Sequence, residues 1–292
     1  MYLDYFGLKM FPFANTGDPR FFYASEAHEE ALANMAYAIE QAKGMVVVTG
    51  EIGTGKTLVS NVLSLRLRRS TVMVSVADPL VRGDQLMRCV YGALLTPHRR
   101  PDRVALQAAL QDRLIALQRM GQRVAVLVDE AQDLSRSALE QVRLMSNWEH
   151  RSEKLIQWVL IGQNELRDTL AQPQWEHLRQ RVVLSYHLTR LDAAQVGPYI
   201  EHRLTVAAGG RRSRVHFDEA AVAIIAEAAR CTPRLINNIS DAALLATYAD
   251  EAFVVTAETA RSVTRDMTSC GWTDASVPTP AGEPQEEIRA AG

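Results

Sequence analysis

The chain has 292 residues, of which 47% are hydrophobic and 23% are charged, a composition that is typical of globular proteins and excludes bulk disorder. At this length the chain can bury one full α/β core and still hold a second, smaller domain. The formal net charge is only −2, so no global field draws the protein onto nucleic acid or anionic lipid.

Five short apolar runs rich in β-branched residues are predicted as strands, at residues 45–49, 71–76, 124–128, 157–161 and 182–186. Their near-continuous hydrophobicity is typical of strands buried on both faces of a parallel sheet. Amphipathic helices are predicted between them, at residues 57–69, 85–95, 104–119 and 137–148. Strands that alternate with helices predict a doubly wound, five-stranded parallel α/β domain.

The sequence pattern changes after residue 191. Helices are predicted at residues 192–205, 218–229, 234–249 and 257–267 with no clear strand between them, and Asp192, Asp218 and Thr256 lie where helix N-caps belong. We therefore assign residues 1–191 to the α/β domain and 192–268 to a small all-α domain. Residues 269–292 contain three prolines among Ala, Gly and Glu and are expected to be a disordered tail.

Cysteine usage and hydropathy bear on the cellular compartment. Cys89, Cys231 and Cys270 form no CxxC pair and have no histidine at metal spacing, so neither a disulfide framework nor a structural zinc site is expected. The first residues lack the basic and apolar regions of a signal peptide, and no apolar run approaches the ~20 residues of a membrane span. We expect a cytoplasmic protein that does not itself insert into a membrane.

A glycine-rich segment follows the first predicted strand: Gly50-Glu51-Ile52-Gly53-Thr54-Gly55-Lys56-Thr57. It matches the Walker A pattern G-x-x-x-x-G-K-[ST] at every fixed position, in the strand–loop–helix context that phosphate binding requires. Its glycines let backbone N–H groups converge on phosphates, and the helix N-terminus adds partial positive charge. We assign all eight residues to ATP binding, with Lys56 on the β- and γ-phosphates and the Thr57 hydroxyl on Mg²⁺.

Lysine usage supports this assignment independently. The chain contains only Lys9, Lys43, Lys56 and Lys154, so most of its basic positions are arginine. One of the few lysines falls where a compact ammonium group suits the loop better than a planar guanidinium. The alternative interpretation is a glycine-rich turn that binds no ligand.

Two adjacent carboxylates, Asp129 and Glu130, end the apolar run at residues 124–128. Ligands of parallel sheets lie beyond the carboxyl ends of the strands, which predicts that Asp129 lies beside the phosphates. Asp129 would hold Mg²⁺ largely through its water shell, and Glu130 would orient and polarise the attacking water. The second carboxylate favours ATP hydrolysis over kinase chemistry; the alternative is an acidic loop that caps the next helix.

With these motifs identified, residues 2–249 resemble the ExeA/GspA family of AAA+ ATPases from bacterial secretion and pilus systems, and in particular its MshM-type members of type IV pilus biogenesis. Beyond the glycine-rich segment, the resemblance rests on Tyr5-Phe6-Gly7-Leu8, Phe11-Pro12-Phe13, Phe22-Tyr23, His28-Glu29-Glu30-Ala31-Leu32, Val128-Asp129-Glu130-Ala131-Gln132, Gly162-Gln163-Asn164-Glu165-Leu166, Leu178-Arg179-Gln180-Arg181 and Thr232-Pro233-Arg234-Leu235-Ile236-Asn237. The many motifs in one order make the resemblance specific.

The resemblance implies further catalytic roles. Gln163 corresponds to sensor 1, whose amide contacts the γ-phosphate or the attacking water, and Arg234 to sensor 2 in the lid domain. Arg181 corresponds to an arginine finger that enters a neighbouring subunit's site. Arg179 is a close rival for that role, and each of these side chains has a purely structural alternative. Phe22 and Tyr23, with Leu235 and Ile236, are candidates for an adenine pocket or for plain core packing.

The sequence departs from the family pattern at two positions: Asn164 stands where the family has Pro, and Cys231 where it has Gly. Longer relatives carry a membrane span and a peptidoglycan-binding region after the ATPase, for which we find no counterpart in this sequence. A role that requires direct contact with the cell wall is therefore not expected, and any association with the inner membrane is expected to be peripheral, through partners.

Three functions compete at this point. The resemblance implies an oligomeric ATPase, a ring or filament, that works with a partner protein to assemble a secretion, type IV pilus or polysaccharide-export machine. The alternative is a transposition-regulator-like ATPase acting on DNA, in which the arginines of residues 66–69 or 211–214 form a track; the near-neutral net charge argues mildly against it. A nucleotide-gated scaffold without turnover is disfavoured by Glu130.

Overall fold

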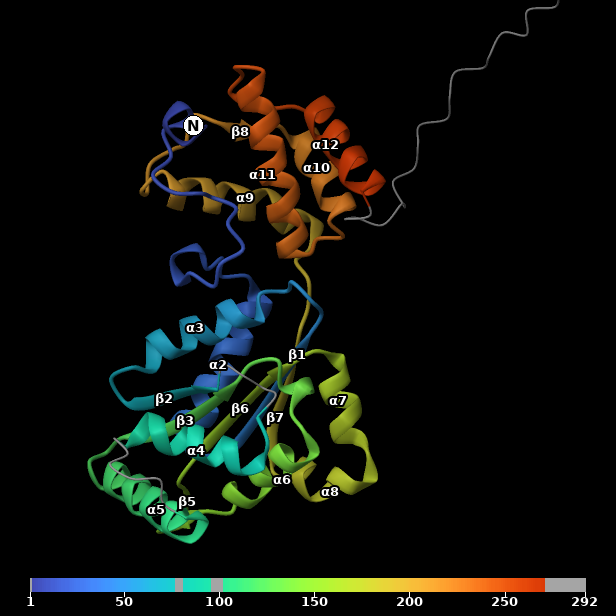
Figure 1. The fold of residues 1–292 in the computed structure, drawn as a ribbon. Coiled ribbons are helices and arrows are strands. Elements are labelled where there is room, and N and C mark those ends of the chain that lie inside the picture. Colours follow the sequence, from blue (N-terminus) through green and yellow to red (C-terminus); the bar gives the residue numbers. More distant parts are fainter. Residues whose placement is uncertain (1, 77–80, 96–101, 271–292) are drawn as a thin grey trace, which may run out of the picture. The chain divides into compact units, whose positions relative to one another are not determined.

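The computed structural model describes residues 2–76, 81–95 and 102–270 (Figure 1). They divide into two compact units, one spanning Asn15–Leu191 and the other combining Met1–Ala14 with the chain from Asp192 onward. Each unit is described here by itself. The predicted disordered tail lies outside the described residues, except for its first two positions, of which Ser269 ends the helix Ala257–Ser269.

A five-stranded sheet forms the centre of the first unit, in the order β2-β3-β6-β1-β7. All four strand pairs are parallel, which confirms the predicted parallel α/β fold. The strands are β1 (Met45–Gly50), β2 (Thr71–Val76), β3 (Arg123–Val128), β6 (Gln157–Gly162) and β7 (Val182–Leu188). The observed limits lie within two residues of the predicted ones because the apolar runs end where the chain leaves the sheet.

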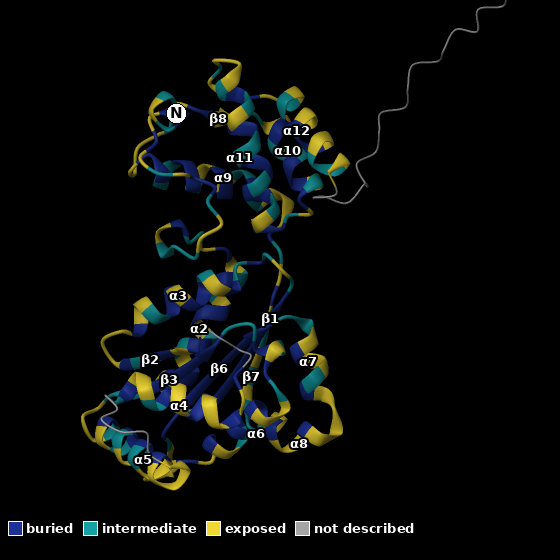
Figure 2. Cartoon of the chain, in the orientation of Figure 1, coloured by how far each residue is buried: buried dark blue, intermediate teal, exposed yellow. Residues whose placement is uncertain are grey.

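Helices cover both faces of this sheet (Figures 1 and 2). Because successive side chains of a strand point to opposite faces, Val46 and Val48 of β1 pack with the helices α2 and α3, whereas Met45 and Val47 pack with α4, α5 and α6. These helices are α2 (Glu26–Glu40), α3 (Lys56–Leu67), α4 (Gly83–Leu94), α5 (Arg103–Arg119) and α6 (Arg136–Met145). The result is a three-layer α/β/α unit.

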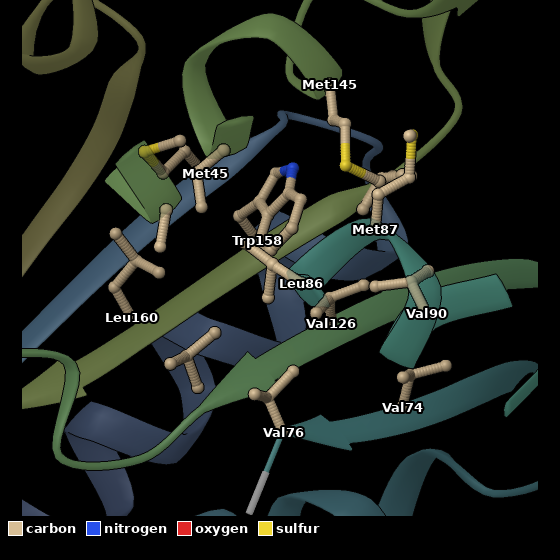
Figure 3. Close-up of a cluster of buried hydrophobic side chains, with 14 of the residues drawn as sticks. Met45, Val74, Val76, Leu86, Met87, Val90, Val126, Met145, Trp158 and Leu160 are labelled. Atoms are coloured by element: carbon tan, nitrogen blue, oxygen red, sulfur yellow. The ribbon is translucent and has the colours of Figure 1, made fainter. Parts of the chain in front are cut away.

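A hydrophobic core lies on each face of the sheet. The larger one, on the side of α4, α5 and α6, contains Trp158 of β6, whose side chain is fully buried among Met45, Leu86 and Met145 (Figure 3). Each fully buried Val, Leu or Met side chain in such a core stabilises the fold by roughly 1.5–3 kcal/mol. Both cores include residues of β1, β3 and β6. These three central strands are therefore packed on both faces, which fixes the positions of their carboxyl ends.

The last strand, β7, differs from its prediction. Residues 182–186 were expected to be buried on both faces, but β7 is an edge strand with alternating burial. Leu184 and Tyr186 pack toward α2, whereas Val183 is 48% exposed on the other face. The sequence pattern does not reveal this difference because it depends on which helices cover the edge.

Several short elements were not predicted. They are the helices α7 (Asn164–Ala171) and α8 (Glu176–Arg179), the 3-10 turns η1 (Pro19–Phe21), η2 (Ala131–Asp133) and η3 (Pro173–Trp175), and the hairpin of β4 (Glu149–His150) with β5 (Glu153–Lys154). The longest unpredicted element is α2, whose N-cap Ser25 accepts a hydrogen bond from the backbone N–H of His28.

The second unit contains the four predicted helices: α9 (Ala193–Ala207), α10 (Glu219–Ala228), α11 (Pro233–Ala249) and α12 (Ala257–Ser269). Asp192, Asp218 and Thr256 are their N-caps as predicted. The unit is not purely helical, since β8 (His216–Phe217) and β9 (Val254–Val255) form a short parallel pair. Among the described residues, no helix has both the length and the apolar character needed to cross a bilayer.

The N-terminal residues belong to the helical unit, although the sequence analysis assigned them to the α/β domain. The helix α1 (Tyr2–Phe6) buries Phe6 completely, and the Tyr2 hydroxyl donates to the Asp241 carboxylate at 2.7 Å. The buried guanidinium of Arg203 donates to the carbonyl oxygens of Pro12 at 2.6 Å and Ala14 at 2.9 Å. Aromatic burial and these carbonyl bonds explain why the segment joins α9 and α11.

Candidate nucleotide site

The loop that follows β1 closes around the side chain of Lys56. This lysine is the first residue of α3 and is only 6% exposed. Its Nζ donates to the carbonyl oxygens of Gly50 at 2.9 Å and Glu51 at 2.8 Å, and the Thr54 hydroxyl donates to the same Glu51 oxygen at 2.9 Å. The loop is thus a compact turn with a buried ammonium group at its centre.

Two glycines allow this loop shape. Gly55, the N-cap of α3, has a φ of 97°, in the left-handed region that favours glycine. A Cβ on Gly50 would lie 2.8 Å from the carbonyl oxygen of Leu188 in β7, so no side chain fits there. The first N–H groups of α3 have no acceptor within the helix and carry the positive end of its dipole. The loop can therefore bind an anion of phosphate size.

Thr57 and Asp129 bring two oxygen ligands together beside this loop. The Thr57 hydroxyl donates to Oδ2 of Asp129 at 2.6 Å, and Oδ1 of Asp129 accepts from the N–H of Glu130 at 3.0 Å. Hydroxyl and carboxylate oxygens suit Mg²⁺, which takes one or two protein ligands and completes its shell with phosphate and water. The described residues hold no cluster of three or more His, Cys, Asp or Glu that could bind a metal alone. The Thr57 hydroxyl and the Asp129 carboxylate, side by side next to the loop, fit a Mg²⁺–nucleotide.

Glu130 is held in an unusual backbone conformation next to Asp129. Its φ of 51° and ψ of 41° lie in the left-handed region, which costs a residue other than glycine roughly 1–3 kcal/mol. Its Oε2 accepts from Nε2 of Gln132 at 2.9 Å and, at 3.4 Å, from Nε2 of Gln163. Gln163 follows β6, and its backbone N–H donates to Oε1 of Gln132 at 3.0 Å. Gln132 therefore links the ends of β3 and β6 and orients the Glu130 carboxylate.

The sequence analysis did not assign roles to two residues of this site. Gln132 belongs to the motif that follows β3, and its amide is the main partner of Glu130. His28 contacts the glycine-rich loop from behind, with Nε2 at 3.0 Å from the Thr54 carbonyl oxygen. Both residues lie in segments that carry the family resemblance, and this membership was the one signal in the sequence that could have pointed to them.

Arg181 directly precedes the first residue of β7, whereas the Lys56 loop follows the end of the neighbouring parallel strand β1. A seven-residue strand spans roughly 23 Å, so Arg181 and the loop lie near opposite ends of these two neighbouring strands. It lines a cavity of about 570 Å³ whose other basic side chains are Lys43, Arg143, Lys154 and His177. Within the described part of the chain, Nε of Arg181 is buried without a hydrogen-bond partner.

Arg179 has a different environment from Arg181. Its Nη1 donates to the carbonyl oxygen of Ala171 at 3.0 Å and, more weakly, to that of Leu170 at 3.5 Å. It thereby caps the C-terminal end of α7, a structural role. In the other unit, Arg234 is exposed as the second residue of α11, whereas Ile236 is fully buried in the helical core.

The fold and the site define the class: the chain has an AAA-type P-loop α/β fold, and residues 39–170 match the family described as AAA domain. Within this class it is related to General secretion pathway protein A of Aeromonas hydrophila, with 39% identity over 250 residues. The match confirms the resemblance to the ExeA/GspA family. It covers 85% of this chain and 45% of the relative, so the chain spans less than half the length of that protein.

Solved structures share the fold at low sequence identity. Cdc6p from Pyrobaculum aerophilum superposes with a TM-score of 0.65 at 15% identity, covering 87% of this chain and 70% of that protein. The Aeropyrum pernix ORC2 protein, in ADPNP–ADP complexes, has a TM-score of 0.64 at 14% identity, covering 87% and 71%. The Thermotoga maritima RuvB Holliday junction branch migration motor has a TM-score of 0.53 at 16% identity, covering 84% and 70%. These likenesses concern the fold alone.

Proposed function

We propose that this protein hydrolyses ATP in the presence of Mg²⁺ and that the residues around the glycine-rich loop carry out the reaction. The observation that carries the proposal is the buried Lys56 ammonium inside the loop, with the Thr57–Asp129 pair next to it. Lys56 and the backbone of residues 50–57 bind and orient the phosphates. Thr57 and Asp129 hold the cation, which when bound supplies charge neutralisation to the γ-phosphoryl group.

Glu130 is the residue to which we assign the attacking water. Its carboxylate orients the water and polarises it, with the Gln132 amide fixing the position of Oε2 at 2.9 Å. Gln163 completes the arrangement as sensor 1, since its amide faces the same carboxylate oxygen. Arg234, a residue of the helical unit, would act as sensor 2.

Arg181 is our candidate for the arginine finger, acting on a neighbouring subunit of a homo-oligomeric ring or filament. Support comes from its distance along β7 from the loop of its own chain and from its unpartnered Nε among the described residues. Arg179 is the weaker candidate because its guanidinium already holds the end of α7. The finger would neutralise charge that develops in the transition state.

The process we propose is assembly or regulation of a bacterial secretion, type IV pilus or polysaccharide-export machine from the cytoplasm, through a partner protein. It rests on the identity with General secretion pathway protein A, and any association with the inner membrane would be peripheral. The alternative function on DNA has less support, because Arg66 pairs with Glu29 at 2.8 Å and so contributes less charge to a basic track. Submicromolar binding to duplex DNA would favour the alternative.

The site is tested with two substitutions that separate binding from hydrolysis. Lys56→Ala should abolish tight binding of Mg-ATP in calorimetry, because it removes the charge inside the loop. Glu130→Gln should bind Mg-ATP like the wild type but release phosphate at least about 10²-fold more slowly. Lys9→Ala removes an exposed lysine of the helical unit and serves as the control. Equal ATP affinity in the wild type and Lys56→Ala would overturn the site assignment.

A further inference from the structure

The side chain of His28 packs against the glycine-rich loop at the Thr54 carbonyl group. It lies in the first turn of α2, and its side chain is buried, with 5% exposure. The ring packs against Phe22 in a T-shaped arrangement, at 6.0 Å between ring centroids and an interplanar angle of 87°. Its two ring nitrogens contact Ser25 and the Thr54 carbonyl oxygen.

The two contacts determine the tautomer of His28. A carbonyl oxygen can only accept, so Nε2 carries the hydrogen that is donated to Thr54 O at 3.0 Å. Nδ1 is then the acceptor, and the Ser25 hydroxyl donates to it. The Ser25 oxygen also accepts from the backbone N–H of His28 at 3.3 Å. Burial lowers the pKa of His28, so the neutral ring is favoured near pH 7.

The hydrogen bond from Nε2 of His28 to the Thr54 carbonyl oxygen fixes the orientation of the Thr54–Gly55 peptide group. In a trans peptide the C=O and the N–H point in opposite directions, so a Thr54 carbonyl that faces His28 turns the N–H of Gly55 away from it. A Cβ on Gly55 would lie 3.0 Å from Nε2 of His28, so the ring fills that side of the loop. Because glycine has few steric limits, this peptide would otherwise flip at low cost.

We propose that His28 is a positioning residue for nucleotide binding, which holds the Thr54–Gly55 peptide so that the Gly55 N–H stays directed to the phosphate side of the loop. The inference rests on the proposed ATP binding but goes beyond it, because it assigns a requirement for a hydrogen-bond donor at position 28. Packing alone would require only volume at this position. A positioning role and a packing role therefore predict different effects for substitutions that keep either the volume or the hydrogen-bond donor.

The experiment compares His28→Phe, which keeps a ring without a donor, with His28→Gln, whose Nε2 can still donate to Thr54. Mg-ATP affinity is measured by calorimetry, and KM and kcat by phosphate release. For His28→Phe we expect Kd and KM to rise roughly 3–10-fold, the effect of one hydrogen bond, with kcat at saturation within about 2-fold. His28→Gln should stay within about 2-fold of the wild type in Kd.

A stability control separates positioning from general weakening. Asp102→Ala removes the N-cap of α5, where Oδ1 accepts from the Ala105 N–H at 2.8 Å, and should lower Tm without changing Kd. In the nucleotide-free protein, nitrogen-15 NMR should show His28 protonated at Nε2 and not at Nδ1, its signals being identified by their loss in His28→Phe. If His28→Phe has a wild-type Kd, or if Nδ1 carries the proton, the proposal is overturned. If the wild type itself does not bind ATP, the proposed function fails instead.

Discussion

At the scale of single residues, Gly55 shows how tightly the loop is built. A side chain at this position has to take a φ of 97° and has to lie 3.0 Å from the His28 ring. Gly55→Ala should therefore destabilise the nucleotide-free protein by about 1–3 kcal/mol and weaken Mg-ATP binding. Thermal unfolding and calorimetry measure the two effects.

The matched control for this prediction is Gly92, an exposed glycine inside α4, where an added Cβ meets no atom within 4 Å. Gly92→Ala should raise stability by about 0.5–1 kcal/mol, since alanine loses less backbone entropy in a helix. If Gly55→Ala unfolds at the wild-type temperature, the backbone conformation described for the loop is incorrect.

The loop and its two carboxylates could be predicted at the residue scale because their chemistry is local in sequence. Lys56, Thr57, Asp129 and Glu130 each follow a predicted strand within a recognisable motif. The contributions of Gln132 and His28 depend on neighbours in space: His28 lies 26 positions before Thr54 and meets it only through the packing of α2. Arg181 and its close rival Arg179 differ in their surroundings, because Arg179 donates to two backbone carbonyl oxygens.

At the scale of elements, the end of α10 shows what one departure from the family pattern, Cys231 in place of glycine, costs in backbone strain. The N–H of Cys231 donates to Ala226 O and that of Arg230 to Glu227 O, both at 3.0 Å, which is a Schellman motif. Cys231 has a φ of 54°, where an L-residue pays about 1–2 kcal/mol. The glycine usual in the family avoids this cost.

Cys231→Gly should therefore stabilise the protein by about 0.5–1 kcal/mol, the relief of left-handed strain less the entropy lost by glycine. Thermal unfolding should show a Tm that is higher by roughly 1–2 °C. Ala228→Gly, one turn earlier within α10, should have the opposite sign because its backbone is helical. A lower Tm for Cys231→Gly would mean that the cysteine side chain contributes more packing than the strain costs.

The regular elements of both units could be predicted because each has a strong local signal, such as the apolar β-branched run of β2 or the N-caps Asp218 and Thr256. α2 also has a local signal, since Ser25 stands at its N-cap and apolar residues recur at helical spacing along Glu26–Glu40, although no helix was predicted there. The pair β8–β9 has two residues per strand, too few for any periodicity. The exposed face of β7 and the place of residues 2–14 depend on tertiary packing, which no local pattern encodes.

At the scale of the whole molecule, the assigned catalytic residues are distributed over two units and, in our proposal, two chains. Lys56, Asp129, Glu130 and Gln163 belong to one unit, and Arg234 belongs to the helical unit. Arg181 would serve the next subunit. Turnover should accordingly depend on assembly and should rise with protein concentration, whereas ATP affinity should depend on it much less.

Mixing two inactive variants tests the contribution of the neighbour directly. Arg181→Ala keeps the hydrolytic carboxylate but has no finger, and Glu130→Gln keeps the finger but not the carboxylate. An arginine finger contributes about 10³–10⁵ in rate, so each variant alone should be nearly inactive while binding Mg-ATP normally. In a 1:1 mixture, roughly a quarter of the head-to-tail interfaces would join an intact finger to an intact carboxylate. Phosphate release should then recover to a corresponding fraction of the wild-type rate.

Arg179→Ala provides the comparison, because loss of its bond to Ala171 should lower Tm and leave most of the turnover in the folded protein. No recovery on mixing, with turnover independent of concentration, would show that Arg181 does not act across subunits.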